Sequence, residues 1–189
     1  LSEQQDDLER MKQTMRRSIM ASSFLVLPLM AGLAAVARPL VSLLLTDKWL
    51  PCVPFLQICC IDFAFYPIHT ANLQAINAMG RSDVFLKLEI VKKSYGIAIL
   101  CVTVFCFEGV LPIVWGAVVS TVISSFVNAF PNKKLIHYGY WEQIRDILPP
   151  IGMSLVMFLS VSALGRLPLG SLPLLLVQVA AGVLLYGGM

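Results

Sequence analysis

Residues 19–37 read IMASSFLVLPLMAGLAAVA, a run of 19 residues without a charged side chain. At a rise of 1.5 Å per residue, a helix needs about 20 apolar residues to cross a hydrocarbon core of about 30 Å. The run therefore predicts a membrane-spanning helix, which continues past Arg38 and Pro39 to residue 45.

Five further apolar windows follow, and period-two alternation, which is typical of membrane strands, is absent from them. We expect six spans, at residues 19–45, 52–79, 86–107, 109–131, 148–165 and 171–188, with a polar segment at 1–18 before them. Of the 189 residues, 58% are hydrophobic and 13% charged, whereas soluble domains carry about 25% charged residues. The composition excludes a soluble enzyme, a nucleic-acid binder and a disulfide scaffold. The predicted fold class is all-α, a polytopic membrane helical bundle within the lipid bilayer and without a nucleic-acid partner.

Positive charge gathers in alternate connections. Of the 14 Lys and Arg residues, eleven lie before the first span, between the second and third, or between the fourth and fifth: Arg10, Lys12, Arg16, Arg17; Arg81, Lys87, Lys92, Lys93; Lys133, Lys134, Arg145. The opposite connections hold Lys48 and Arg166. Because cytoplasmic connections are rich in Lys and Arg, we expect residue 1 and segment 1–18 to be cytoplasmic.

Two connections have patterns of their own. Gly80 predicts a helix stop and Ser82-Asp83 a new helix start, with Asp83/Lys87 and Glu89/Lys93 as ion pairs one turn apart. Residues 133–147 place Trp141 and Ile144 on one face, which predicts a short amphipathic helix at the headgroup level.

The second span carries ionisable residues, which are costly inside a bilayer and usually face a cavity or a partner. Asp62 and His69 are seven residues apart and would lie within about 20° on one helix, with Asn72 one turn beyond His69. Pro67 predicts a kink or local unwinding between them. One interpretation is a polar stripe that faces a central aqueous cavity. The alternative places Asp62 near the outer boundary and lets a neighbouring helix satisfy His69.

Arg38, at the outward end of the first span, would contact an anionic lipid or a sugar phosphate, or else extend to the external headgroups. The candidate substrate-pathway residues are therefore Arg38, Asp62, His69 and Asn72. Other amides, Gln57, Gln74, Asn77 and Asn128, would line a cavity or form hydrogen bonds between helices.

Motifs for catalysis are absent from the sequence. It holds no H-E-x-x-H, no G-x-x-x-x-G-K-[ST] and no G-x-S-x-G, and its five cysteines form no C-x-x-C pair. We expect no catalytic residues, no metal and no cofactor, and a protein that is not an enzyme.

Several stretches resemble a known family. Residues 2–12, SEQQDDLERMK, resemble the S-x-x-Q-x-D-x-E-R-L-K segment of bacterial polysaccharide and lipopolysaccharide (O-antigen) exporters, flippases of the multidrug/oligosaccharidyl-lipid/polysaccharide exporter superfamily. Residues 43–58 are similar to the family's LLLGxKW…LQIL region, with Thr46-Asp47 in place of its glycine. Residues 75–93, AINAMGRSDVFLKLEIVKK, resemble its lqAxGRSDxxLKxxxxKK stretch.

The resemblance implies a transporter of 12–14 helices in two lobes, of which this chain would be a C-terminal part, the later spans of the second lobe. We expect a piece of a longer chain for a second reason, because the sequence opens on Leu1 and stops within an apolar run. The implied partners are a polyprenyl-diphosphate-linked glycan and a missing N-terminal lobe of the same polypeptide. The implied activity is flipping of undecaprenyl-diphosphate-linked oligosaccharide across the bacterial inner membrane, by alternating access, for O-antigen, capsule or exopolysaccharide synthesis.

Two alternatives remain open. An ion-coupled multidrug exporter of the same superfamily would use intramembrane carboxylates such as Asp62. A membrane-embedded glycan polymerase or ligase would carry large periplasmic loops, whereas the external connections here are short.

Overall fold

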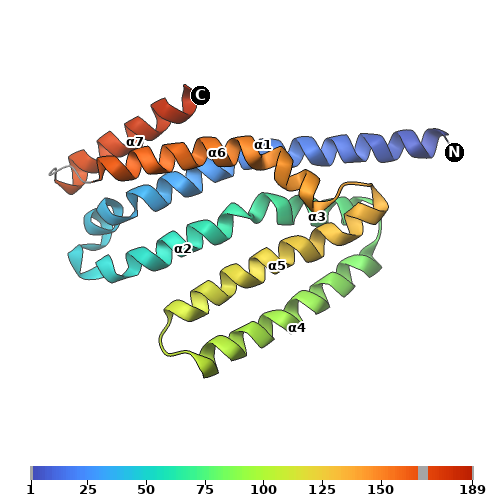
Figure 1. The fold of residues 1–189 in the computed structure, drawn as a ribbon, viewed down its shortest axis with the longest axis horizontal. Helices are drawn as coiled ribbons and strands as arrows, with labels where there is room; N and C mark the ends of the chain where they lie inside the picture. The colour runs from blue at the N-terminus through green and yellow to red at the C-terminus, as the bar shows by residue number, and fades with distance from the viewer. Residues whose placement is uncertain (1, 166–169, 189) are drawn as a thin grey trace. The chain divides into compact units, whose positions relative to one another are not determined.

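The computed structural model describes residues 2–165 and 170–188, with side chains from residue 8 onward, so Arg166 lies outside the described residues. The elements in chain order are α1 (Ser2–Leu45), the 3-10 helix η1 (Asp47–Cys52), α2 (Val53–Ala64), α3 (Tyr66–Ala78), α4 (Ser82–Cys106), α5 (Leu111–Leu135), α6 (Tyr140–Leu164) and α7 (Ser171–Gly187). Every regular element in the described ranges is a helix, which confirms the all-α class (Figure 1).

Four stretches of the described chain are long and apolar enough to cross a membrane: Leu8–Leu45, Asp47–Ala78, Leu111–Leu135 and Tyr140–Leu164. The 44 residues of α1 make a helix about 66 Å long, more than twice the hydrocarbon thickness, so part of α1 extends beyond the bilayer. Of the other two predicted spans, α4 is interrupted by Glu89, Lys92 and Lys93, and α7 has 17 residues. The bundle is that of a multi-pass membrane protein.

The chain forms two compact units. The first contains residues 2–23 and 65–147, that is, the start of α1, then α3, α4, α5 and the first turns of α6. Helices α4 and α5 are a packed hairpin joined by residues 107–110, in which Gly109 has φ +94°, a conformation that favours glycine. Helix α3 packs against both of them.

The second unit contains residues 24–64, 148–165 and 170–188. Its core is Val36 of α1 with Met157 and Val161 of α6, and Tyr186 of α7 packs against this core. Pro28 has no N–H to offer the carbonyl of Phe24 one turn earlier, and the Tyr186 hydroxyl donates to that carbonyl at 2.6 Å. The tyrosine thus satisfies the acceptor that the proline leaves without a helical donor.

Two predicted segments differ in the structure. The stretch 52–79 is broken at Phe65 into α2 and α3, with Pro67 in the first turn of α3, where its missing N–H costs no helical bond. The local break predicted near Pro67 is thus confirmed. Residues 133–147 do not form a helix of their own: α5 continues to Leu135, and α6 begins at Tyr140 and runs on through two prolines.

The start of α4 follows the predicted pattern in backbone but not in ion pairs. Gly80 has φ +67°, as a glycine after a helix end does, and Arg81 is the N-cap residue. The predicted pairs with Lys87 and Lys93 are wrong, because Asp83 pairs with Arg81 at 3.1 Å and Glu89 pairs with Lys92. Residues two or three positions apart supply the nearer cation in both cases.

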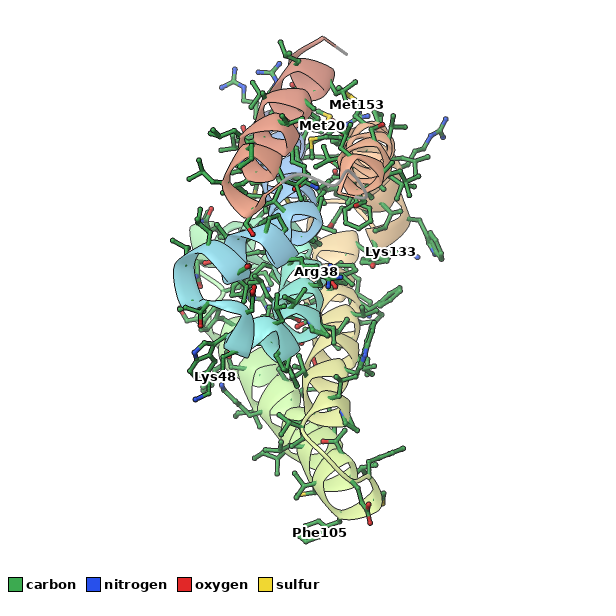
Figure 2. The ribbon with its side chains drawn as sticks, turned by 90° about the vertical axis from the view of Figure 1, so that its left-hand side faces the viewer. Met20, Arg38, Lys48, Phe105, Lys133 and Met153 are labelled. Atoms are coloured by element: carbon green, nitrogen blue, oxygen red, sulfur yellow. The ribbon has the colours of Figure 1, made fainter. Side chains whose placement is uncertain are left out.

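Large apolar side chains cover the outer surfaces of the helices. Phe105, near the end of the α4–α5 hairpin, is 85% exposed, and Figure 2 shows its ring projecting away from the ribbon. Such exposure in water would favour association, whereas in a bilayer these side chains face lipid.

Candidate functional site

His69 lies at the interface of α3 and α5 in the first unit. Its Nε2 is 3.1 Å from the backbone carbonyl of Thr121 and 3.2 Å from the Ser125 hydroxyl. Its Nδ1 is 3.0 Å from the side-chain nitrogen of Asn128. Both ring nitrogens therefore have partners on α5, as the alternative reading of this residue predicts.

The partners on α5 belong to one stripe of polar residues. Thr121, Ser125, Asn128 and Asn132 are spaced by four, three and four residues along α5, so they lie on one face of a helix whose other residues are mostly apolar. Ser125, Asn128 and Asn132 are all 0% exposed. Because a polar group in lipid needs a partner inside the protein, this stripe directs α5 toward α3.

Asn72 joins three helices through its amide. Its nitrogen donates to Gln143 of α6 at 2.7 Å, and its oxygen accepts from Gln143 at 3.0 Å and from Asn132 of α5 at 2.7 Å. Asn72 and Gln143 thus form a reciprocal pair of amides, and all three side chains are fully buried. We call Asn72, Asn132 and Gln143 the amide cluster.

Charged residues connect α1 to the start of α6 beside this cluster. Arg16 donates to Asp146 at 2.5 Å, and the hydroxyl of Tyr138 donates to the other oxygen of the same carboxylate at 2.8 Å. The hydrogen bond to Asp146 raises the pKa of the Arg16 guanidinium, and burial raises the pKa of Tyr138. The phenol therefore remains a donor at any physiological pH. Lys12 donates to the carbonyl of His137 at 2.9 Å and pairs with Glu142 at 3.3 Å.

A cavity of about 540 Å³ lies between α1 and α3 in the same unit. It is lined by Arg10, Met11, Thr14, Met15 and Ser18 of α1 and by Ala71, Gln74, Ala75 and Ala78 of α3. Its wall is mainly apolar, and Arg10 is the charged residue among those that line it. None of the four predicted pathway residues lines this cavity.

The other two predicted residues belong to the second unit. Arg38 is exposed on α1, next to the buried Pro39. Asp62 on α2 is partly buried, and its Oδ1 is buried without a hydrogen-bond partner among the described residues. Since the helix is broken at Phe65, the seven-residue spacing no longer places Asp62 and His69 on one face of a continuous helix.

The structure thus joins His69 and Asn72 to a polar interface whose other members the sequence reasoning had not assembled. Asn128 fulfils the interhelical role expected of it, and so does Gln57, which donates to the carbonyl of Ala34 at 3.1 Å. Asn132 and Gln143 were missed. The four-three-four spacing of polar residues along α5 is the signal that could have identified Asn132. Gln143 lies in a polar segment, where one more amide does not differ from its neighbours in the sequence.

These features define a multi-pass helical membrane protein with a buried polar interface among α3, α5 and α6. Residues 1–54 match the model of a family described as "Polysaccharide biosynthesis protein". Over 129 residues, 68% of the chain, the sequence is 27% identical to an "Uncharacterized membrane protein in cps region" of Klebsiella pneumoniae. The aligned region is 26% of that relative, so the chain spans about a quarter of the length of the curated protein it matches. No solved structure matches the chain.

Proposed function

We propose that the protein is part of a flippase that moves a polyprenyl-diphosphate-linked oligosaccharide across the bacterial inner membrane, by alternating access. One observation carries the proposal. The similarity to the polysaccharide biosynthesis family covers residues 1–54, of which 2–54 contain α1, η1 and the first two residues of α2. It therefore falls on a membrane helix rather than on a soluble catalytic domain. A membrane-embedded component of glycan assembly is best suited to handling the lipid-linked intermediate.

The physical need for such a protein is plain. Sugars and a diphosphate cannot enter hydrocarbon without losing their hydrogen bonds to water, so they cross only along a polar route between helices. Arg38 is the cation of the second unit that would bind the diphosphate. Charge-assisted hydrogen bonds between arginine and phosphate are strong and would favour this contact. Asp62, with its unpartnered oxygen, would contact sugar hydroxyls, and His69 and Asn72 would support the helices beside the route. The reaction breaks no covalent bond and uses no cofactor.

The complete transporter would be longer than this chain. In the proposal, a further lobe of the same polypeptide supplies the opposite wall of the route, and residue 1 of this chain lies on the cytoplasmic side. The Klebsiella relative supports the greater length of the complete protein, since the aligned region covers 26% of that relative.

The test uses the full-length gene in its own host, deleted and then restored with variants. Deletion should abolish surface glycan and leave the lipid-linked precursor in the cytoplasmic leaflet, and the wild-type gene should restore export. Asp62→Asn and Arg38→Ala should slow export at unchanged protein abundance. Lys48→Ala, which removes an exposed cation from η1, is the matched control and should export normally.

Unchanged surface glycan in the deletion strain would refute the proposal. The unpartnered Asp62 oxygen also suits an ion-coupled multidrug exporter. In that case the deletion strain would keep its glycan and become sensitive to cationic drugs, and Asp62→Asn would reproduce the sensitivity. A glycan-negative strain with normal drug resistance supports the flippase.

A further inference from the structure

The contacts of His69 determine where its proton lies. A backbone carbonyl can only accept, so the Thr121 oxygen at 3.1 Å requires a hydrogen on Nε2. An amide nitrogen can only donate, so the Asn128 nitrogen at 3.0 Å requires a lone pair on Nδ1. The Ser125 hydroxyl donates to the same Thr121 carbonyl at 3.1 Å. With the Asn128 amide in this orientation, the contacts fit a neutral imidazole protonated on Nε2.

A single rotation would fit this site to an imidazolium. If the Asn128 amide turns by half a revolution, its oxygen takes the place of its nitrogen opposite Nδ1 and accepts a hydrogen from it. The Nε2–H bond to Thr121 is unchanged. The third combination, hydrogen on Nδ1 alone, places the Nε2 lone pair 3.1 Å from the Thr121 carbonyl oxygen, where two acceptors repel. The Ser125 hydroxyl, 3.2 Å from Nε2, could donate to that lone pair only by giving up its bond to the Thr121 carbonyl. Two states are thus well bonded, one neutral and one with an added proton.

The Asn128 amide is able to turn because only one end of it is held. Its Oδ1 is buried and has no hydrogen-bond partner among the described residues, while the side chain is 0% exposed. Turning the amide therefore breaks no bond at that end, but it moves the amide N–H groups into this buried position, and the new bond to the imidazolium has to offset the cost of burying them there. The contrast is Asn72, whose amide is bonded at both ends to Gln143 and cannot turn without losing those bonds.

We propose that His69 and Asn128 form a proton-binding site at the α3–α5 interface, in which a proton from water binds Nδ1 of His69 and the Asn128 amide turns to accept its hydrogen bond. The proton is the ligand, and no other bond is made or broken. This site is independent of the cargo, and it goes beyond the proposed function by giving the membrane interior a group that exchanges protons with water.

The neighbouring titratable groups are held by other partners. Helix α5 has no ionisable side chain between Leu111 and Asn132. On α4, Tyr95 bonds Ser124 at 2.5 Å and Glu89 pairs with Lys92. On α6, Glu142 and Asp146 pair with Lys12 and Arg16 of α1, and α3 itself adds the exposed Tyr66. Among the contacts described above, the Thr121 carbonyl and the turned amide are the acceptors that stabilise the added charge.

The experiment is ¹⁵N and ¹³C NMR of the full-length protein, labelled selectively at histidine and asparagine, in lipid bilayers between pH 5 and 8.5. A His137→Asn variant removes the other histidine signal of this chain, because asparagine tolerates the positive φ of 52° found there, and histidines elsewhere in the polypeptide are assigned by a His69→Gln spectrum. We expect the Nε2–H neutral form at high pH and the doubly protonated form at low pH, with the Asn128 side-chain ¹⁵N signal changing in the same transition.

Two variants of Asn128 act in opposite directions. Asn128→Leu keeps the shape but removes the acceptor, so the proton affinity of His69 should fall about tenfold or more, since hydrogen bonds to charged groups are the strong ones. Asn128→Asp offers an acceptor in either orientation and should raise the affinity by a similar factor. Gln74→Leu, a change at an exposed amide on α3, is the control and should leave the transition where it is.

An Nδ1–H neutral form at high pH would overturn the proposal. So would a His69 that stays neutral down to pH 5, or a transition that Asn128→Leu and Asn128→Asp both leave unmoved. The proposal survives even if one variant fails to fold, because the neutral form and the wild-type transition are measured without it.

Discussion

The reciprocal amide pair between α3 and α6 allows a quantitative test of how the first unit is held together. Asn72→Leu keeps the branched shape of the side chain and removes two hydrogen bonds with Gln143, one from Asn132 and one to the carbonyl of Ile68 on the same helix. The partner amides then remain buried with fewer bonds: Gln143 retains a long contact of 3.4 Å to the carbonyl of Tyr138. The cost of the single substitution is therefore set as much by the groups left behind as by the bonds lost.

The magnitudes follow from bonds of this kind. Interhelical hydrogen bonds in membranes contribute about 0.6 kcal/mol on average and up to about 1.7 kcal/mol. A buried donor or acceptor left without a partner costs about 1–3 kcal/mol. We expect about 3 kcal/mol of destabilisation for Asn72→Leu and a similar loss for Gln143→Leu. The double variant should lose about 4 kcal/mol, since it removes both members of the pair.

The assay is equilibrium unfolding of the full-length protein in mixed micelles, followed by circular dichroism, as a double-mutant cycle. The expected coupling between Asn72 and Gln143 is about 2 kcal/mol. Asn77→Leu, an exposed amide on the same helix, should couple to Gln143 by less than about 0.5 kcal/mol. Additive losses for the Asn72 and Gln143 variants would refute the reciprocal pair.

Three other predictions concern single contacts. Gly116→Ala would place a Cβ 2.7 Å from a methyl carbon of Thr103, so overpacking of about 1–3 kcal/mol should exceed the helix-propensity gain of about 1 kcal/mol. Gly96→Ala is the control, because its Cβ would have its nearest contact at 3.8 Å, and it should not destabilise the protein. Equal effects of the two substitutions in the unfolding assay would contradict this packing. Tyr186→Phe should lower the free energy of unfolding by about 0.5–1.5 kcal/mol, because it removes the donor to the Phe24 carbonyl. The loss should be much smaller in a Pro28→Ala background, where the helical N–H of residue 28 replaces the tyrosine as donor. The same loss in both backgrounds would disprove the role of the proline. The hydrogen bond from Arg81 lowers the pKa of Asp83. The contribution of this exposed pair to folding stability is therefore complete above the ordinary carboxyl pKa and is lost as the pH falls through the lower pKa of the folded state. Arg81→Gln should raise the pH at the midpoint of Asp83 titration in ¹³C NMR, and an unmoved midpoint would show that the pair does not form.

The candidate site could be predicted only in part. His69 and Asn72 stand out because polar residues are rare in a membrane helix, and both do lie at a polar interface in the structure. The sequence left open whether they face a cavity or a neighbouring helix, since periodicity describes the face of one helix and not what covers it. For Asp62, the break at Phe65 changes the geometry that the spacing implied.

What the sequence determined by itself is the class of protein and the position of most helices. Apolar length, proline and glycine act within a few residues of where they stand, so the helix end at Leu45, the break next to Pro67 and the stop at Gly80 are all readable locally. Only the tertiary structure decided which polar groups bind one another. Asn72, which is buried, meets Gln143 from 71 positions away, and the exposed Arg16 meets Asp146 from 130, because polar groups take their partners from whichever helix packs beside them.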